Sequence, residues 1–254
     1  MRNPQFILTP YFLDQALPGL EDLSQSGWQT NRINPTGNSV IRRIAEIHTG
    51  LADLVEKAVK AGSRPVSLAG DCCTTLGILA GLARSGITPQ LIWFDAHGDF
   101  NTWETSPSGF LGGMPLAMLA GLGEQTILEI LGIDPLPQEN IILTDARDLD
   151  PGEKKLIAAS RVIHMKDPLT LLETQLPDGP LWIHFDTDVV DPDYVPAQNY
   201  PAPGGINPTD LGRIFRHLAS SGDIVALSLS SWAPDLSGAK ESRDMSLELL
   251  GMLL

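Results

Sequence analysis

Residues 90–101 read QLIWFDAHGDFN. The first half is a run of apolar side chains that predicts a strand. The second half places Asp95, His97 and Asp99 two positions apart. In an extended segment, side chains at this spacing point the same way. We therefore expect a strand whose carboxyl end carries a row of polar groups.

The rest of the chain alternates between strand-like and helix-like segments. From Val40 to Lys60, apolar residues recur at three- and four-residue spacing, as on an amphipathic helix, and another helix is expected over 75–86. Strands separated by helices indicate βαβ units and a largely parallel sheet. The proline-rich residues 191–205 are interpreted as a long loop. The other strand-like runs are residues 5–11, 65–70, 140–146, 161–165, 181–190 and 223–232.

Composition narrows the class of protein. With 254 residues, of which 43% are hydrophobic, the chain fits one domain spanning residues 1–254. The 17 basic and 31 acidic residues give a net charge of −14, which argues against a nucleic-acid partner and suits cations or a basic small molecule. No apolar run is long enough to span a membrane, and no signal-peptide pattern is present. With two cysteines, this predicts a cytoplasmic protein.

Acidic residues follow several predicted strands. Asp95 and Asp99 follow one strand, and Asp186 and Asp188 follow another. In open parallel sheets the ligand site lies at the carboxyl ends of the strands. Four carboxylates and the imidazole of His97 on one edge are too costly as uncompensated charges, and they suit a pair of divalent cations. The abundance of carboxylates favours Mn²⁺.

Two motifs, DAHGD at 95–99 and FDTDVVDP at 185–192, resemble signature motifs of the ureohydrolase family of arginases and agmatinases. The resemblance extends roughly over residues 64–235. It implies a three-layer α/β fold with a parallel sheet of about eight strands. It also implies two Mn²⁺ ions per chain and hydrolysis of a small guanidino compound by a hydroxide held between them. Members of this family often form trimers or hexamers, so the resemblance also implies that this chain could form a homo-oligomer.

The resemblance also assigns metal ligands. Asp95 and Asp186 would bridge the two ions. His97 and Asp188 would complete one site, and Asp99 would complete the other. Asp99 would also hydrogen-bond the hydroxide, which makes it the predicted catalytic residue.

The two cysteines stand in a third family motif. The family reads Gly-Gly-Asp-His-Ser where this chain reads AGDCC at 69–73, so Cys72 takes the position of a metal-binding histidine. We predict that Cys72 ligates metal and that Cys73 is a small buried residue, although both could merely be buried small residues. His184 shares a strand face with Asp186. It is either a partner of the metal ligands or a core histidine, and the second interpretation is favoured.

Other residues bear on the substrate. Asn101 and Ser108 have the spacing of the Asn and Ser that bind the substrate α-carboxylate in arginases. The segment ARDLDPGE at 146–153 resembles the arginase segment whose Asp, here Asp150, binds the α-ammonium, with Glu153 assisting behind it. Each residue alone could be a turn or helix cap. The joint match favours an α-amino acid.

The departures from the family matter equally. In LGGMP at 111–115, Gly112 stands where arginases carry a proton-shuttling His, which leaves room for an extra hydroxyl on the substrate. Ser231 stands where arginases carry a Glu that pairs with the guanidinium. The pattern resembles the Nω-hydroxy-L-arginine hydrolases of cycloserine biosynthesis and predicts cleavage to ornithine and hydroxyurea. The alternatives are a ureohydrolase for arginine, agmatine or formiminoglutamate, and an inactive metal-binding homologue.

Overall fold

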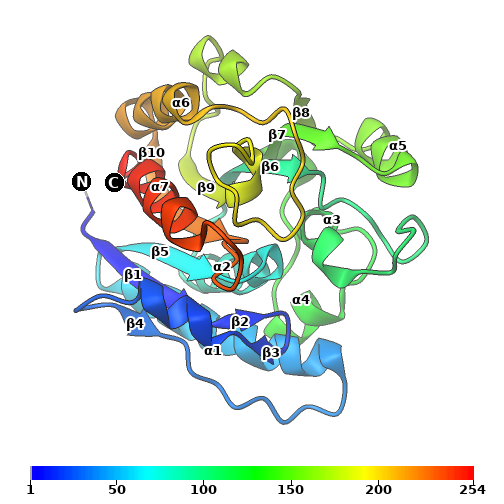
Figure 1. Cartoon of the computed structure of the whole chain (residues 1–254). Coiled ribbons are helices and arrows are strands. Elements are labelled where there is room, and N and C mark those ends of the chain that lie inside the picture. Colours follow the sequence, from blue (N-terminus) through cyan, green and yellow to red (C-terminus); the bar gives the residue numbers. More distant parts are fainter. Residues whose placement is uncertain (1) are drawn as a thin grey trace.

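The computed structural model describes residues 2–254. Eight strands form one sheet in the order β4-β1-β5-β10-β9-β6-β7-β8, and every neighbouring pair is parallel (Figure 1). This confirms the predicted parallel sheet. Its strands are β1 Pro4–Thr9, β4 Gln29–Thr30, β5 Arg64–Ala69, β6 Gln90–His97, β7 Ile141–Asp148, β8 Ile163–Met165, β9 Pro180–Asp186 and β10 Asp223–Ser230. A separate antiparallel pair consists of β2 Tyr11–Phe12 and β3 Gln15–Ala16.

Helices cover both faces of the sheet, so the chain has three layers (Figure 1). One face packs against α1 Val40–Lys60, α2 Thr75–Arg84, α3 Pro115–Leu119, α4 Thr126–Leu131 and α5 Pro151–Ala159. The other packs against α6 Pro208–Ser221 and α7 Ala239–Gly251. None of these helices is both long and apolar enough to cross a membrane, within the part of the chain that the structure describes.

Alternation along each strand sorts side chains between the two cores. In β6, Trp93 packs toward α1 and α2, whereas Phe94 packs toward α6. Helix α2 can lie close to α1 because Gly81 has no side chain, since a Cβ atom there would overlap Val55. The result is a sheet buried on both faces. Its polar groups therefore gather at the strand ends, where loops are exposed.

Candidate metal centre

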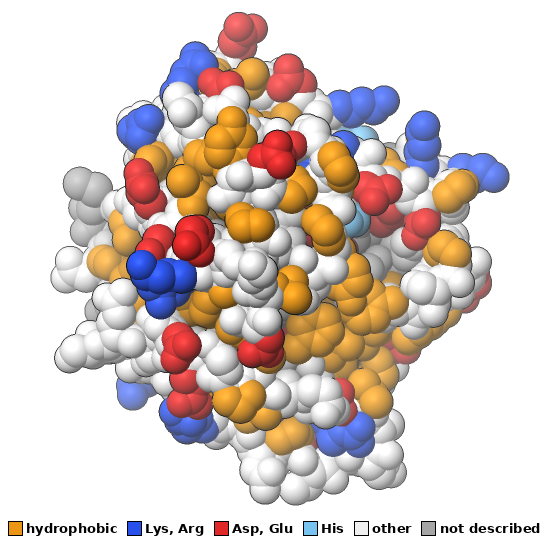
Figure 2. Space-filling model, viewed as in Figure 1, with side chains coloured by type: hydrophobic (Ala, Val, Ile, Leu, Met, Phe, Trp, Pro, Cys, Tyr) orange, Lys and Arg blue, Asp and Glu red, His pale blue; other side chains and the backbone are white. Residues whose placement is uncertain are grey.

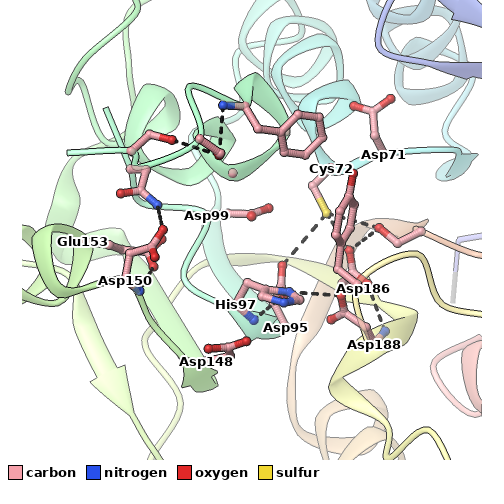
Figure 3. Close-up of a pocket in the computed structure, with 18 of the residues that line it drawn as sticks. Asp71, Cys72, Asp95, His97, Asp99, Asp148, Asp150, Glu153, Asp186 and Asp188 are labelled. Carbon is pink, nitrogen blue, oxygen red and sulfur yellow. Dashed lines mark hydrogen bonds and ion pairs between the residues drawn. The ribbon is translucent and has the colours of Figure 1, made fainter. Parts of the chain in front are cut away.

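A cavity of about 420 Å³ opens at the carboxyl ends of the central strands. Its lining contains every site residue that the sequence predicts. β5 leads into Cys72, β6 carries or precedes Asp95, His97 and Asp99, and β9 ends at Asp186. Figure 3 shows these groups facing a common space. The predicted residues in the lining are Cys72, Asp95, His97, Asp99, Asn101, Ser108, Asp150, Glu153, Asp186 and Asp188.

The potential metal ligands fall into two groups. Within each group, one ligand atom from every residue lies within 4.8 Å of all the others. The first group is Cys72, Asp95, His184 and Asp186, and the second is Asp95, His97 and Asp188. Only Asp95 belongs to both groups. The bridging role predicted for Asp186 therefore stays a prediction.

Hydrogen bonds to backbone N–H groups orient these potential ligands. Asp186 ends β9, and one of its carboxylate oxygens accepts the backbone N–H of Asp188 at 2.9 Å. The backbone N–H of Ala96 in turn donates to Asp188 at 3.1 Å, which joins β6 to the turn after β9. Asp71 caps the turn that carries the cysteines by accepting the backbone N–H of Cys73 at 2.9 Å. The potential ligands are thus held in place by backbone N–H groups at or just after the ends of β5, β6 and β9.

Burial sets the protonation of the cluster. Burial and the neighbouring Asp188 raise the pKa of Asp186 to about 7. Burial and the charge of Asp186 raise the pKa of the Cys72 thiol, which contacts Asp186 at 2.7 Å. Burial alone would lower the pKa of His97, but its contacts with Asp188 and Asp95 outweigh this effect and raise the pKa to about 12. A bound cation must therefore displace protons, because ligating groups must be deprotonated.

Asp99 provides the clearest test of whether a metal fits. Its side chain is 6% exposed and its backbone has the left-handed φ of 48°, which is strained for a residue other than glycine. Burial and the carboxylate of Asp95 raise its pKa well above the usual value. Figure 3 shows the carboxylate aimed into the cavity, where no hydrogen bond from residues 2–254 meets it. A buried carboxylate in this position fits a cation, as does the surrounding oxygen-rich donor set.

Asp150 and Glu153 lie on the side of the cavity away from Cys72 and Asp186 (Figure 3), and Asn101 and Ser108 line the same cavity. Asn101 Nδ2 donates to Asp150 at 2.9 Å, so the two residues form one polar wall. Asp150 is also the N-cap of α5, so the helix-cap interpretation is confirmed, while its role in binding the substrate stays a prediction. Glu153 is buried behind this wall and accepts the backbone N–H groups of Phe100 at 2.7 Å and Asp150 at 3.2 Å. It therefore braces the wall, and its pKa is raised to about 7, chiefly by burial.

The ring of Phe110 lies directly beside Gly112, which lines the cavity. A Cβ atom on Gly112 would overlap the ring of Phe110. That ring continues into an aromatic wall, with Phe12 at 6.3 Å and Tyr200 at 5.5 Å between ring centroids. Figure 2 shows hydrophobic side chains gathered where Figure 1 places α3 and the loop before α6. The Phe110 ring therefore occupies the direction in which a side chain at Gly112 would leave the backbone, while Gly112 still lines the cavity, and room for a hydroxyl stays a prediction.

Sequence reasoning missed several lining residues. The aromatic wall comes from β2 and from two separate loops, and no spacing in the sequence connects them. Asp148, which also lines the cavity, lies in the motif used to assign Asp150 but received no role. His184 does not line the cavity and is 1% exposed, as a core histidine would be, yet its Nε2 atom lies 3.3 Å from Cys72 Sγ, as a partner of the ligands would. Its spacing from Asp186 was the available signal.

Comparisons with known proteins agree with this geometry. The family model described as the arginase family matches residues 10–253. The chain belongs to the arginase family. It is 31% identical to the arginase of Bacillus caldovelox, over 89% of this chain and 81% of that protein. It is 32% identical to the Nω-hydroxy-L-arginine amidinohydrolase of Streptomyces lavendulae, over 67% of this chain and 61% of that protein.

Structural comparison extends over the whole fold. The crystal structure of arginase from Bacillus subtilis has a TM-score of 0.86 and 28% identity, covering 100% of this chain and 98% of that one. This arginase-family protein is therefore a metal-dependent amidinohydrolase with the α/β arginase fold.

The adjacent cysteines offer a matched test of metal binding. Cys72→Ser should weaken metal affinity by at least about tenfold, because it removes a donor that lines the cavity. Cys73→Ser should leave the affinity unchanged, because Cys73 is fully buried and its sulfur faces the carbonyl of Leu111 at 3.6 Å. Competition with a metal-binding dye measures both. Equal effects at the two positions would contradict the ligand assignment.

Proposed function

We propose that this protein cleaves the guanidino group of an arginine-like amino acid and prefers Nω-hydroxy-L-arginine, giving ornithine and hydroxyurea. The oxygen of water bonds to the guanidino carbon. The bond from that carbon to the nitrogen carried by the δ carbon then breaks, and this nitrogen takes up a proton and leaves as the side-chain amine of ornithine. Two Mn²⁺ ions are proposed, one for each ligand group. When bound, such ions lower the pKa of water and supply the nucleophile. Asp99 orients the attacking water through its carboxylate.

The polar wall supports an α-amino acid as substrate. The Asn101 amide and the Asp150 carboxylate lie together, and Ser108 lies in the same cavity. An amide and a hydroxyl can donate to the substrate α-carboxylate, while the Asp150 carboxylate can accept from its α-ammonium. The wall stands opposite the carboxylate cluster. An extended amino acid can therefore place its head group on the wall and its guanidino carbon beside the cluster.

One observation carries the preference for a modified guanidine: the ring of Phe110 covers Gly112. No histidine can act as a proton shuttle at this position while the ring stays there. A second departure agrees with it. Ser231, where arginases carry a Glu, donates its hydroxyl to Asp186 and presents no charge to the cavity. The two replacements remove a proton shuttle and a carboxylate, both of which serve a strongly basic guanidinium in arginases.

The chemistry of the substrate explains why these losses are tolerable. An ordinary guanidinium keeps its charge in proteins because its pKa is above about 12. Placing that charge near cations without a carboxylate partner costs roughly 2–5 kcal/mol. Hydroxylation withdraws electrons and lowers the pKa, so more of the substrate is neutral and its carbon is more electrophilic. A neutral hydroxyguanidine therefore needs neither the missing carboxylate nor the missing acid.

Ornithine release tests this proposal, because arginine and hydroxyarginine yield the same product. With Mn²⁺-loaded protein, kcat/KM for Nω-hydroxy-L-arginine should exceed that for arginine by at least about tenfold, since a missing general acid usually costs 10²–10⁴ in rate. Nω-hydroxyagmatine, which lacks the α-carboxylate and would give putrescine instead of ornithine, is the matched control for the polar wall; its cleavage, followed by release of hydroxyurea, should be slow. Equal rates for arginine and hydroxyarginine, or cleavage of neither, would contradict the proposal.

Hydrolysis of arginine itself is the second candidate. It is favoured by the relatives from Bacillus caldovelox and Bacillus subtilis, both named arginase, the latter 34% identical over 80% of this chain. The same ornithine measurement separates the two candidates. If kcat/KM for arginine equals or exceeds that for hydroxyarginine, arginine hydrolysis is the function.

A further inference from the structure

His184 lies directly behind the proposed sulfur ligand. It precedes Asp186 by two positions on β9, and its Nε2 atom is 3.3 Å from Cys72 Sγ. The ring packs against Trp93 with 3.9 Å between ring centroids, and the residue is 1% exposed. Packing on one side and hydrogen bonding at both nitrogens therefore fix the orientation of the imidazole.

The direction of these hydrogen bonds can be worked out. The indole N–H of Trp182 can only donate, and it reaches the hydroxyl oxygen of Ser228 at 3.0 Å. That hydroxyl also lies 2.9 Å from Nδ1 of His184. Donation from Ser228 to Nδ1 gives the Trp182 and Ser228 hydrogens one partner each. The Ser230 hydroxyl, 3.5 Å from Nε2, can donate to Asp186 at 3.3 Å instead. The imidazole then carries its proton on Nε2, which faces Cys72 Sγ.

We infer that His184 is a positioning residue for Cys72, holding its sulfur toward the metal ligands with an Nε2–H···S hydrogen bond. The inference rests on the ligand role proposed for Cys72. A metal-bound cysteine is a thiolate, and here it would join a cavity already lined by carboxylates. An N–H donor offsets part of that negative charge and restricts the rotation of the side chain. Partners of this kind commonly orient metal ligands.

Direct ligation by His184 is the competing arrangement. Its ring nitrogen is within 4.8 Å of the donor atoms of Cys72, Asp95 and Asp186. Ligation through Nε2 would require the proton to sit on Nδ1. Ser228 would then accept from both Trp182 and His184, and its own hydroxyl hydrogen would have no partner among these contacts. The positioning role leaves no such hydrogen unpaired.

Two substitutions distinguish the arrangements. His184→Gln keeps an N–H donor near the position of Nε2 but is a poor metal ligand, whereas His184→Leu keeps only the bulk. His48→Leu is the matched control, because His48 is also 1% exposed and lies outside the cluster. Thermal unfolding shows whether each variant folds. The readouts are metal affinity and the near-ultraviolet thiolate band of the Co²⁺-loaded protein.

We expect His184→Leu to weaken metal affinity about 10–100-fold, the usual effect of losing such a partner, and to move the thiolate band to longer wavelength. His184→Gln should restore most of both, and His48→Leu should change neither. If Gln is as harmful as Leu, His184 is a ligand and the inference fails. It also fails if Leu has no effect, or if the wild-type protein shows no thiolate band. Ornithine release tests the proposed function separately.

Discussion

Asp95→Asn should abolish metal loading of both ligand groups and lower kcat/KM by at least about 10³-fold. Asp95 alone belongs to both groups, and its carboxylate also accepts the backbone N–H of His97 at 2.7 Å and the Trp93 indole N–H at 3.0 Å. An amide is a far weaker ligand for hard cations than a carboxylate. Losing the groups that stabilise a transition state typically costs this much in rate. Elemental analysis and ornithine release measure the two effects.

For the metal-free protein, the effect expected of Asp95→Asn on thermal stability is the opposite of its effect on metal loading: no loss, or a gain. Burial and the charge of Asp186 raise the pKa of Asp95, so its ionised form destabilises the folded state as pH rises above the ordinary carboxyl range. Replacement by a neutral amide removes that cost. Without metal, Asp95→Asn should unfold at a temperature equal to or above that of the wild type near pH 7.

The matched control for Asp95 is Asp148→Asn. Asp148 lines the same cavity but belongs to neither ligand group, so its replacement should preserve metal content and the metal-induced rise in Tm. Full metal content in Asp95→Asn would show that the cluster is not the metal site. A lower Tm for its metal-free form would contradict the charge argument.

The double variant Phe110→Ala/Gly112→His should raise kcat/KM for arginine by about 10²-fold, the scale of a restored general acid. The Phe110 ring now covers the space above Gly112, so the new imidazole can enter only when the ring moves or is removed. Gly112→His alone should not gain this activity, because its Cβ atom would overlap the ring. Phe110→Ala alone opens space without adding an acid. The gain should therefore be strongly non-additive.

Ornithine release from arginine measures all four members of this cycle. Hydroxyarginine activity serves as the internal control, and it should rise much less because its carbon depends less on an acid. If Gly112→His alone gains as much as the double variant, the ring does not control the position. If the double variant gains nothing, the missing histidine does not determine the substrate.

Much of the fold follows from local patterns. The alternation of apolar runs with amphipathic helices was enough to predict a parallel sheet, and the structure has one. The convergence of Asp95 and Asp186 was also predictable, because both follow strands and parallel strands end at the same edge. Asn101 and Asp150, which lie 49 positions apart, meet for a similar reason. They follow β6 and β7, which are neighbours in the sheet.

By itself, then, the sequence determined the layered α/β architecture and the edge of the sheet that gathers carboxylates. Tertiary structure alone decided which side chains touch there. His184 on β9 reaches Cys72, which follows β5, across the single intervening strand β10, and local periodicity does not encode that strand order. Phe110 covers Gly112 because packed proteins leave few voids, so a neighbouring ring takes the space that a missing side chain leaves.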